Sequence, residues 1–402
     1  MKAAHIVTSF DGGAARAAER IGKALYDRGV ESELFALSGN NGSGNIIYAQ
    51  TLVDKIRKKV DMKLNGKVQN NLKGDWYMHL NEIAPVYSGF DRLKEYDLIH
   101  LHWINKGIWS KEFIGFLIRL GKPVVWTLHD MWPFTGGCHY PGDCEGYLSG
   151  CKECSHVNKR SVTEDLVNYK ICSYKSLNIR FVGCSNWITD EFNKSYIARE
   201  SEKKAIWIAN PIPLRYFEIK SREACRSVLG IESKKKMILF GAQSSDKDMR
   251  KGYDLLKKAL EGLDPDTYCF GIFGNSERTD LDDRFDVYNF GIVNDDLHLS
   301  AVYGASDVFV APSRQENFAN TVMEALSCGI PVAAFDIGGM RDMISDGKNG
   351  ALVTKMDADS LMTGMEKAAG ITDRTYIRNS VVSKYSPRTI ADNYSSLYGE
   401  ML

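Results

Sequence analysis

Two glutamates, eight residues apart, are the first candidates for chemistry in this sequence. Glu316 follows Pro312-Ser313, and Glu324 comes two helical turns later. Carboxylates in such positions can accept hydrogen bonds from the hydroxyl groups of a ligand. Glutamates at this spacing are also common on solvated helix faces, so the pair by itself does not identify a site.

Four cysteines and two histidines fall close together in a second candidate site: Cys138, His139, Cys144, Cys151, Cys154 and His156. Cys151-x-x-Cys154 has the spacing of a zinc knuckle, whereas the five residues between Cys138 and Cys144 are more than usual. A structural zinc held by the four cysteines, with either histidine as a substitute ligand, is one interpretation. Reduced structural thiols are the other, and a zinc-stapled binding protein without catalytic activity would fit the same residues.

The sequence around the two glutamates predicts a parallel βαβ unit. An apolar strand at residues 307–310 is followed by a helix expected from about residue 317 to 328, with Gly329 as a left-handed C-cap. A second strand at residues 330–335 and the turn Gly338-Gly339 come next. Because ligands bind at the carboxyl ends of parallel strands, we expect a crevice there into which these residues project: Glu316, Asn317, Phe318 and the glycine turn.

Another glycine pair, Gly12-Gly13, follows a strand expected at residues 3–8 and precedes a helix to about residue 28. Glycine lets the backbone approach a ligand closely, and the helix N-terminus offers N–H groups to an anion or a hydroxyl. A plain turn between strand and helix is the alternative. The pair lacks the third glycine and the acidic ribose partner of a dinucleotide-binding fingerprint, which disfavours a dehydrogenase.

The composition is typical of a soluble protein of two domains. The chain has 402 residues, 44% of them hydrophobic and 25% charged. Its 51 basic residues equal its 51 acidic residues, so no global field would attract nucleic acid. The sequence contains no apolar run long enough for a transmembrane helix and no signal-peptide pattern, so we expect a cytoplasmic location. We expect the interdomain linker at Asn210-Pro-Ile-Pro213, because two prolines exclude a helix or a central strand.

Glu316 and Glu324, together with Pro312-Ser313 and the glycines Gly329, Gly338 and Gly339 at these spacings, resemble the donor-binding motif of family-four retaining glycosyltransferases. This resemblance implies the GT-B fold, an α/β architecture of two Rossmann-like, doubly wound parallel-sheet domains that face a cleft. It implies an acceptor-side domain at residues 1–211, a nucleotide-sugar-binding domain at 212–383, and a C-terminal helix, 384–402, that packs back on the first domain.

The resemblance also implies roles for individual residues. Glu324 would accept hydrogen bonds from the ribose of the donor, and Glu316 from hydroxyls of the transferred sugar. His129, at the end of a strand in the first domain, would face the donor sugar. The turn Gly12-Gly13 would face the acceptor and the donor phosphates, and Asn317 and Phe318 would line the donor site.

The phosphate-binding residues match the family only in part. Lys251, ahead of a glycine, matches the family's lysine. The usual arginine is missing from its loop, where Gln243-Ser244-Ser245 stands, so Arg250 or Lys247 would have to substitute. Ser244 remains among the donor-binding candidates. Since no metal ion is expected in catalysis, lysine, arginine and helix N-termini would stabilise the leaving diphosphate.

We therefore expect a retaining glycosyltransferase that moves a sugar from a UDP- or GDP-linked donor to a glycan or lipid-linked oligosaccharide. The cysteine loop and the segment from Trp132 to His139 are similar to enzymes of bacterial surface polysaccharide biosynthesis, such as colanic acid transferases. Another nucleotide-sugar enzyme of the same fold, such as an epimerase, is the alternative.

Two further patterns allow a structural and a functional interpretation. His100 and His102 share one face of an expected strand, and without a third ligand nearby we interpret them as wall or core residues. Basic residues dominate residues 55–73, where apolar residues recur at helical spacing. This stretch is either a solvated face or a peripheral contact with the anionic inner face of a membrane.

Overall fold

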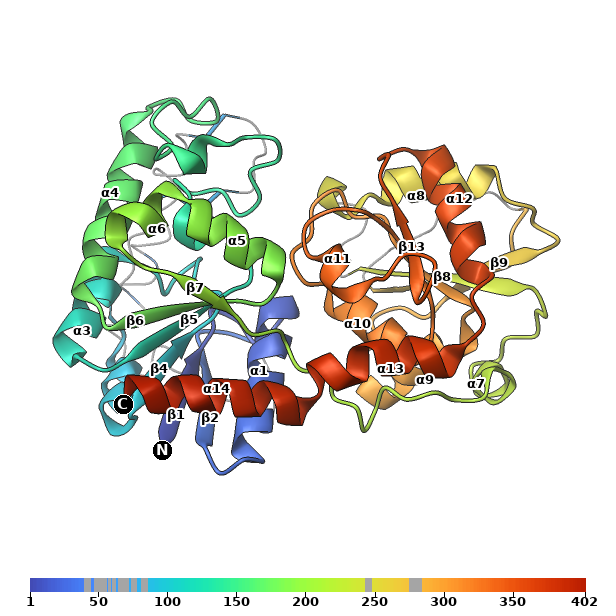
Figure 1. Cartoon of the computed structure of the whole chain (residues 1–402), viewed down its shortest axis with the longest axis horizontal. Coiled ribbons are helices and arrows are strands. Elements are labelled where there is room, and N and C mark those ends of the chain that lie inside the picture. Colours follow the sequence, from blue (N-terminus) through green and yellow to red (C-terminus); the bar gives the residue numbers. More distant parts are fainter. Residues whose placement is uncertain are drawn as a thin grey trace. The chain divides into compact units, whose positions relative to one another are not determined.

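The computed structural model describes residues 1–39, 45–46, 56, 59, 63, 72–73, 78–80, 86–242, 248–274 and 284–402. These residues form two compact units, Met1–Asn210 with Ile390–Leu402, and Pro211–Thr389. Each unit is built on its own parallel sheet, with helices packed against it (Figure 1). Among the helices of these residues, none combines the length and the apolar character needed to cross a membrane.

The first unit contains a seven-stranded sheet in the order β3-β2-β1-β4-β5-β6-β7. Its strands are β1 Lys2–Ile6, β2 Glu31–Ala36, β3 Asn45–Ile46, β4 Leu98–Leu101, β5 Val124–Leu128, β6 Ile179–Gly183 and β7 Ala205–Trp207. Its helices include α1 Gly13–Tyr26, α3 Lys111–Leu120, α4 Ser161–Ser176, α5 Asn186–Lys194 and α6 Tyr196–Ser201. Three short 3₁₀ helices are η1 Ser88–Glu95, η2 Trp132–Phe134 and η3 Gly146–Leu148.

The C-terminal helix α14, Pro387–Met401, packs on the sheet of the first unit. Two of its tyrosines form buried hydrogen bonds with the sheet: the Tyr398 hydroxyl lies 2.6 Å from His100 Nδ1, and the Tyr394 hydroxyl lies 2.9 Å from Thr127 Oγ1. Trp126, next along β5, points to the other face and packs against Tyr174 of α4. Strand alternation thus separates a polar face under α14 from the aromatic core of this unit.

The second unit contains a six-stranded sheet in the order β10-β9-β8-β11-β12-β13. Its strands are β8 Lys236–Ala242, β9 Tyr268–Gly274, β10 Val287–Asn289, β11 Val308–Ala311, β12 Val332–Phe335 and β13 Gly350–Val353. Its helices are α7 Arg222–Val228, η4 Met249–Lys251, α8 Tyr253–Glu261, α9 Asp296–Ala305, α10 Asn320–Ser327, α11 Met340–Met343, α12 Ala358–Ala369 and α13 Arg374–Tyr385. The central strands β11 and β12 are fully buried, as their continuous apolar sequences require in a parallel sheet.

The helix expected from about residue 317 begins three residues later, at Asn320, and this expectation was wrong. The preceding loop is tied to distant residues, because the Arg314 backbone N–H donates to the carbonyl of Arg250 at 2.7 Å and its guanidinium pairs with Asp254. These contacts compete with a helical turn. The C-terminal end agrees with expectation, since Gly329 has a φ of 73° just after the helix.

Candidate functional site

Each sheet has one point at which its strand order reverses, and the candidate residues lie at these points. The reversal falls between β1 and β4 in the first unit and between β8 and β11 in the second. Connections leave such neighbouring strands in opposite directions, which opens a crevice at their carboxyl ends. The loop after β11 carries Glu316, and the loop after β1 carries Gly12-Gly13.

Glu316 lies in a cluster with two cationic side chains in the second unit. Its Oε2 is 2.6 Å from Lys251 Nζ and 3.8 Å from Arg250 Nη1. Its Oε1 accepts from the backbone N–H of Asn317 at 3.3 Å. Burial by itself would raise the pKa of Glu316, but the charges of Lys251 and Arg250 outweigh burial and hold this pKa below its ordinary value. The Glu316 carboxylate therefore lies beside two cations, and a second carboxylate, that of Asp248, pairs with Arg250 at 2.9 Å.

The turn that presents Lys251 and Arg250 is fixed by its backbone. Asp248 caps it by accepting from the N–H of Arg250 at 3.1 Å, and Gly252 follows with a φ of 68°. A Cβ on Gly252 would lie 1.9 Å from the carbonyl oxygen of Pro312, so no other residue fits there. The same close approach ties this turn to the loop that carries Glu316.

Glu324 lies on α10 and is fully buried. Its Oε2 accepts a hydrogen bond from the hydroxyl of Tyr303, on α9, at 3.1 Å. Burying a carboxylate is costly unless polar groups support it, so a fully buried glutamate on a helix is a candidate binding residue. The expected position of Glu324 on this helix, two turns beyond Glu316 in the sequence, agrees with the structure.

The other residues expected near Glu316 differ in what they contact. Asn317 is buried beside the Glu316 carboxylate. Phe318 is also buried, and its ring packs edge-on against Tyr385 of α13. The Gly338-Gly339 turn meets the Glu316 loop directly, because the N–H of Gly339 donates to the Glu316 carbonyl at 3.4 Å. Phe318 therefore forms part of the wall of the site, whereas Asn317 borders its charged cluster.

In the first unit, Gly12 is the N-cap of α1 and has a φ of 97°. Gly13 is the first residue of the helix, so helix N–H groups lie at the carboxyl end of β1. This turn is connected to the end of β4, since Thr8 donates through its backbone N–H to the Trp103 carbonyl at 2.9 Å and through its hydroxyl to the Asn105 carbonyl at 2.6 Å.

His129, half-buried just after β5, is the last member of a row of histidines whose other members, His5 and His102, are buried. His5 Nδ1 lies 3.1 Å from His102 Nε2, and His102 Nδ1 lies 3.0 Å from His129 Nε2. Burial lowers the pKa of all three, to about 3 for His5 and about 4 for His129. The three rings are therefore neutral at physiological pH, and each has one N–H donor and one acceptor nitrogen.

The direction of these hydrogen bonds follows from the inner end of the row. His5 Nε2 is buried and has no hydrogen-bond partner among the described residues. Because an orphaned buried N–H is rarer than an unused lone pair, we assign the proton of His5 to Nδ1. His5 then donates to His102, and His102 donates to His129. This assignment leaves His129 with its own proton on Nδ1.

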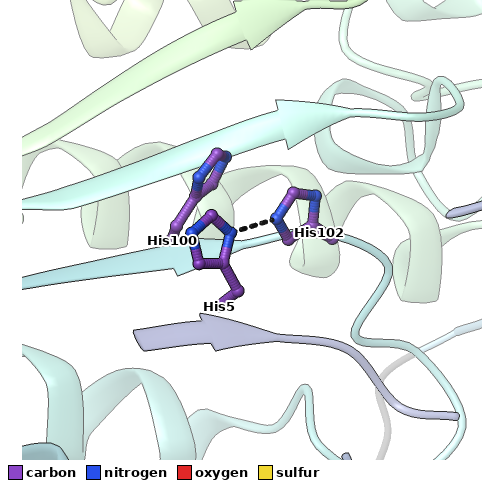
Figure 2. Close-up of side chains that lie close together, drawn as sticks. All are labelled: His5, His100 and His102. Carbon is purple, nitrogen blue, oxygen red and sulfur yellow. Dashed lines mark hydrogen bonds between the residues drawn. The ribbon is translucent and has the colours of Figure 1, made fainter. Parts of the chain in front are cut away.

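Figure 2 shows His5 beside His100 and His102, and one ring nitrogen from each lies within 4.8 Å of the others. His5 is thus a possible third metal ligand, which the sequence did not reveal. His5 lies on β1, where it pairs in register with His100 of β4. At His100 and His102 a metal ion would have to displace existing bonds, since His100 Nδ1 and Nε2 contact Tyr398 and Thr127 and both nitrogens of His102 contact other histidines. The arrangement favours the structural interpretation of His100 and His102.

Sequence reasoning missed a second polar network, centred on Asp130. The carboxylate of Asp130 accepts from His139 Nδ1 at 2.6 Å, from the indole N–H of Trp103 at 2.8 Å and from the backbone N–H of Trp132 at 2.9 Å. Burial would raise the pKa of Asp130, but these partners, His139 above all, hold it below its ordinary value. The other nitrogen of His139 contacts His79 Nδ1. His139 is thus engaged on both sides and is not free to replace a cysteine at a zinc ion.

The remaining sequence candidates divide into two groups. Cys138, Cys144, Cys151 and Cys154 line a single pocket and form no disulfide. Ser244 and Lys247 lie outside the described residues, as does most of the basic stretch at 55–73. Of that stretch, Lys59, Lys63 and Lys73 are described, and all three are exposed.

Two family models match the chain, one in each unit. Residues 11–156 match "Glycosyltransferase Family 4", and residues 235–369 match "Glycosyl transferases group 1". The first match contains His129 and the glycine turn, and the second contains Lys251, Glu316 and Glu324. The candidate residues of both units therefore lie inside glycosyltransferase domains.

Relatives that cover most of the chain are also named as glycosyltransferases. The chain is 24% identical over 410 residues, 96% of each protein, to WcaC of Escherichia coli, a glycosyl transferase named for colanic acid biosynthesis. It is 26% identical over 345 residues, 80% of each protein, to an uncharacterized glycosyltransferase of Methanocaldococcus jannaschii.

Solved structures identify the fold. Sucrose-phosphate synthase from Thermosynechococcus elongatus aligns with a TM-score of 0.69 at 18% identity, over 100% of this chain and 98% of the other. HepE from Anabaena, in complex with UDP, aligns with a TM-score of 0.67 at 16% identity, over the full length of both chains. The chain is a glycosyltransferase of the GT-B fold, composed of a family-four N-terminal domain and a group-one C-terminal domain.

Proposed function

We propose that this glycosyltransferase moves a sugar from a nucleotide-sugar donor, with retention of configuration, to a glycan or lipid-linked acceptor in bacterial surface polysaccharide biosynthesis. The observation that carries the proposal is the contact of Glu316 with Lys251 and Arg250 at the switch point of the second unit. The cluster combines an acceptor of hydroxyl hydrogen bonds with two cations, and a sugar diphosphate presents hydroxyls and negative charge side by side.

Lys251 and Arg250 are suited to receive the diphosphate. Their side chains are 27% and 22% exposed, whereas that of Glu316 is only 10% exposed. A ligand can therefore reach the two cations from solvent, and phosphate oxygens would replace part of the contact that Lys251 makes with Glu316. Cations fixed near the leaving group stabilise the charge that develops as the glycosidic bond to phosphate breaks.

Glu316 and Glu324 would then orient the donor rather than react with it. Glu316, held by Lys251, would accept hydrogen bonds from the transferred sugar, and Glu324 would accept them from the ribose. The acceptor hydroxyl would attack C1 from the face that the diphosphate leaves. The new O–C1 bond would form as the bond from C1 to the phosphate oxygen breaks, and that phosphate would take the proton of the hydroxyl.

The comparisons support the choice of donor and pathway. HepE was solved with UDP and with UDP-glucose, and WcaC is named for colanic acid, a surface polysaccharide. A second solved neighbour, WaaG, is involved in lipopolysaccharide biosynthesis. UDP-sugars are accordingly the first donors to test, followed by GDP-sugars.

The test is product analysis with full-length protein, a panel of UDP- and GDP-sugars and a lipid-linked oligosaccharide acceptor. We expect one donor to give a glycoside with the anomeric configuration of the donor, and Glu316→Gln to abolish transfer while the exposed Glu366→Gln control keeps it. A product of inverted configuration would exclude retention. Interconversion of nucleotide-sugars without any acceptor would indicate an epimerase instead.

We further propose that the protein works at the inner face of the cell membrane, where a lipid-linked acceptor is accessible. The support is the excess of basic residues at 55–73 in the sequence. Near anionic lipid each basic side chain contributes roughly 1 kcal/mol, an attraction that salt weakens. Full-length protein should sediment with anionic vesicles at low salt and not with neutral ones, and equal binding to both would contradict attachment through this stretch.

A further inference from the structure

The cysteine loop between β5 and α4 has chemistry that sugar transfer does not use. Its described backbone contains only the short 3₁₀ helices η2 and η3. Four cysteines of this loop line one pocket together with His156, although their positions in the sequence span seventeen residues, from 138 to 154. Cys144 is exposed and Cys151 and Cys154 are half-buried, so an ion can enter from solvent.

Backbone N–H groups point at three of the four sulfur atoms. Cys151 Sγ accepts from the N–H of Gly136 at 3.2 Å, and Cys144 Sγ accepts from the N–H of Gly146 at 3.4 Å. Cys154 Sγ accepts hydrogen bonds from the backbone N–H groups of His156 and Val157. Such bonds fix the orientation of each sulfur, as outer-shell hydrogen bonds do for metal ligands.

A buried lysine next to the pocket lacks a carboxylate partner. Lys170 of α4 is fully buried, and its ammonium donates to the carbonyl oxygens of Trp132 and Thr135. Among the described residues no carboxylate lies within ion-pair distance of Lys170 Nζ. Burial lowers the pKa of Lys170, and the groups whose charges would oppose this effect are Cys151, Asp130 and Cys138. An anionic centre at the cysteines would supply the missing counter-charge.

We propose that Cys138, Cys144, Cys151 and Cys154 bind one zinc ion, balanced by the buried ammonium of Lys170. Four thiols lose their protons to solvent, and four thiolates around one divalent cation carry a net charge of two minus. No electrons are transferred. The site is structural, because four protein ligands leave no open position for a substrate.

Binding requires the four sulfurs to move closer together. In the described part of the chain, only His5, His100 and His102 bring three donor atoms within 4.8 Å of one another, so the sulfurs are more widely spread around their pocket. Zinc binds thiolates at about 2.3 Å, which would draw the loop inward. The same loop carries His139, so zinc would also stabilise the hydrogen bond from His139 to the Asp130 carboxylate.

The experiment measures metal in full-length protein purified under reducing conditions without chelator. We expect about one zinc per chain, and after exchange with cobalt(II) the absorption bands of tetrahedral cobalt bound to thiolates. Cys151→Ser should lose most of the metal, whereas Cys172→Ser, an exposed cysteine on α4 outside the loop, should keep it. Lys170→Met retains all four ligands but should bind zinc more weakly. The chelator concentration that removes zinc from this variant should be at least tenfold lower than the one that removes it from the parent.

Two results would overturn the proposal. One is parent protein with less than about a tenth of a zinc per chain that, after reconstitution, also gives no thiolate–cobalt spectrum. The other is a Cys151→Ser variant that binds zinc and cobalt like the parent. Lys170→Met with unchanged zinc affinity would exclude the balancing role of this ammonium.

Discussion

Replacing the two partners of the Lys251–Glu316 pair, singly and together, tests the donor site most sharply. Lys251 Nζ and Glu316 Oε2 are 2.6 Å apart, and the glutamate is the more buried partner. Leaving one member of a buried pair unpaired costs about 3–5 kcal/mol. Since Arg250 remains 3.8 Å from Glu316 and Lys251 is partly exposed, we expect Lys251→Met to lower the free energy of unfolding of the second unit by about 2–3 kcal/mol.

Glu316→Gln should cost less, about 1 kcal/mol, because the ammonium of Lys251 can then turn to solvent. The double variant should be more stable than Lys251→Met, because no buried carboxylate is left unpaired. The pKa of Glu316 is lowered by folding, so the contribution of its charge is present above its ordinary pKa and lost as the pH falls through the lowered value. The stability difference between the parent and Glu316→Gln should therefore shrink in acid.

Nucleotide binding should separate the two residues. Lys251→Met removes a charged hydrogen bond to the diphosphate, worth about 1.5–3 kcal/mol, so UDP or GDP should bind roughly 10–100-fold more weakly. Glu316→Gln should bind the same nucleotide at least as tightly as the parent, because Lys251 is no longer shared with a carboxylate. Both variants should lose turnover, since in the proposed site Lys251 and Glu316 both contact the reacting sugar diphosphate.

The assays are titration calorimetry with the free nucleoside diphosphates, differential scanning calorimetry of the full-length protein and turnover of whichever donor sugar the product analysis identifies. If Glu316→Gln weakens the binding of UDP or GDP as much as Lys251→Met does, Glu316 contacts the nucleotide and not the sugar. If both variants bind nucleotide and turn over like the parent, the donor site lies elsewhere in the protein.

Gly252→Ala should disrupt the turn that presents Lys251 and abolish nucleotide binding, because its Cβ would lie 1.9 Å from a backbone oxygen. Gly230 has a similar φ of 67° and open space around it, so in a thermal melt Gly230→Ala should lower the free energy of unfolding by only about 1–2 kcal/mol. Glu324→Gln should weaken the binding of nucleoside monophosphate and of nucleotide-sugar equally, about tenfold by calorimetry, and leave the binding of inorganic diphosphate unchanged. His102→Ala should lower kcat and leave KM nearly unchanged, because His129 loses the hydrogen bond that orients it. His102→Gln can both donate and accept a hydrogen bond, so it should recover part of the lost kcat. Full activity in both variants would exclude a positioning role for His102.

Local sequence patterns were sufficient for the elements that carry the donor motif. The apolar runs that became β11 and β12 and the left-handed Gly329 follow from burial, turn chemistry and helix capping. These rules depend on residues only a few positions apart, so they need no tertiary information. The start of α10 could not be predicted in this way, because a contact between Arg314 and Asp254, sixty residues apart, holds the preceding loop.

The contacts that give the candidate residues their charge and orientation depend on the tertiary structure. Lys251 and Glu316 are 65 residues apart in the sequence, and only the neighbouring positions of β8 and β11 in the sheet bring their loops together. His5 and His102 are 97 residues apart and meet because β1 pairs with β4. The residue types at the strand ends can be read from local sequence alone. Parallel strands pair through crossover connections of unpredictable order, so only the folded sheets decided which of those residues become neighbours.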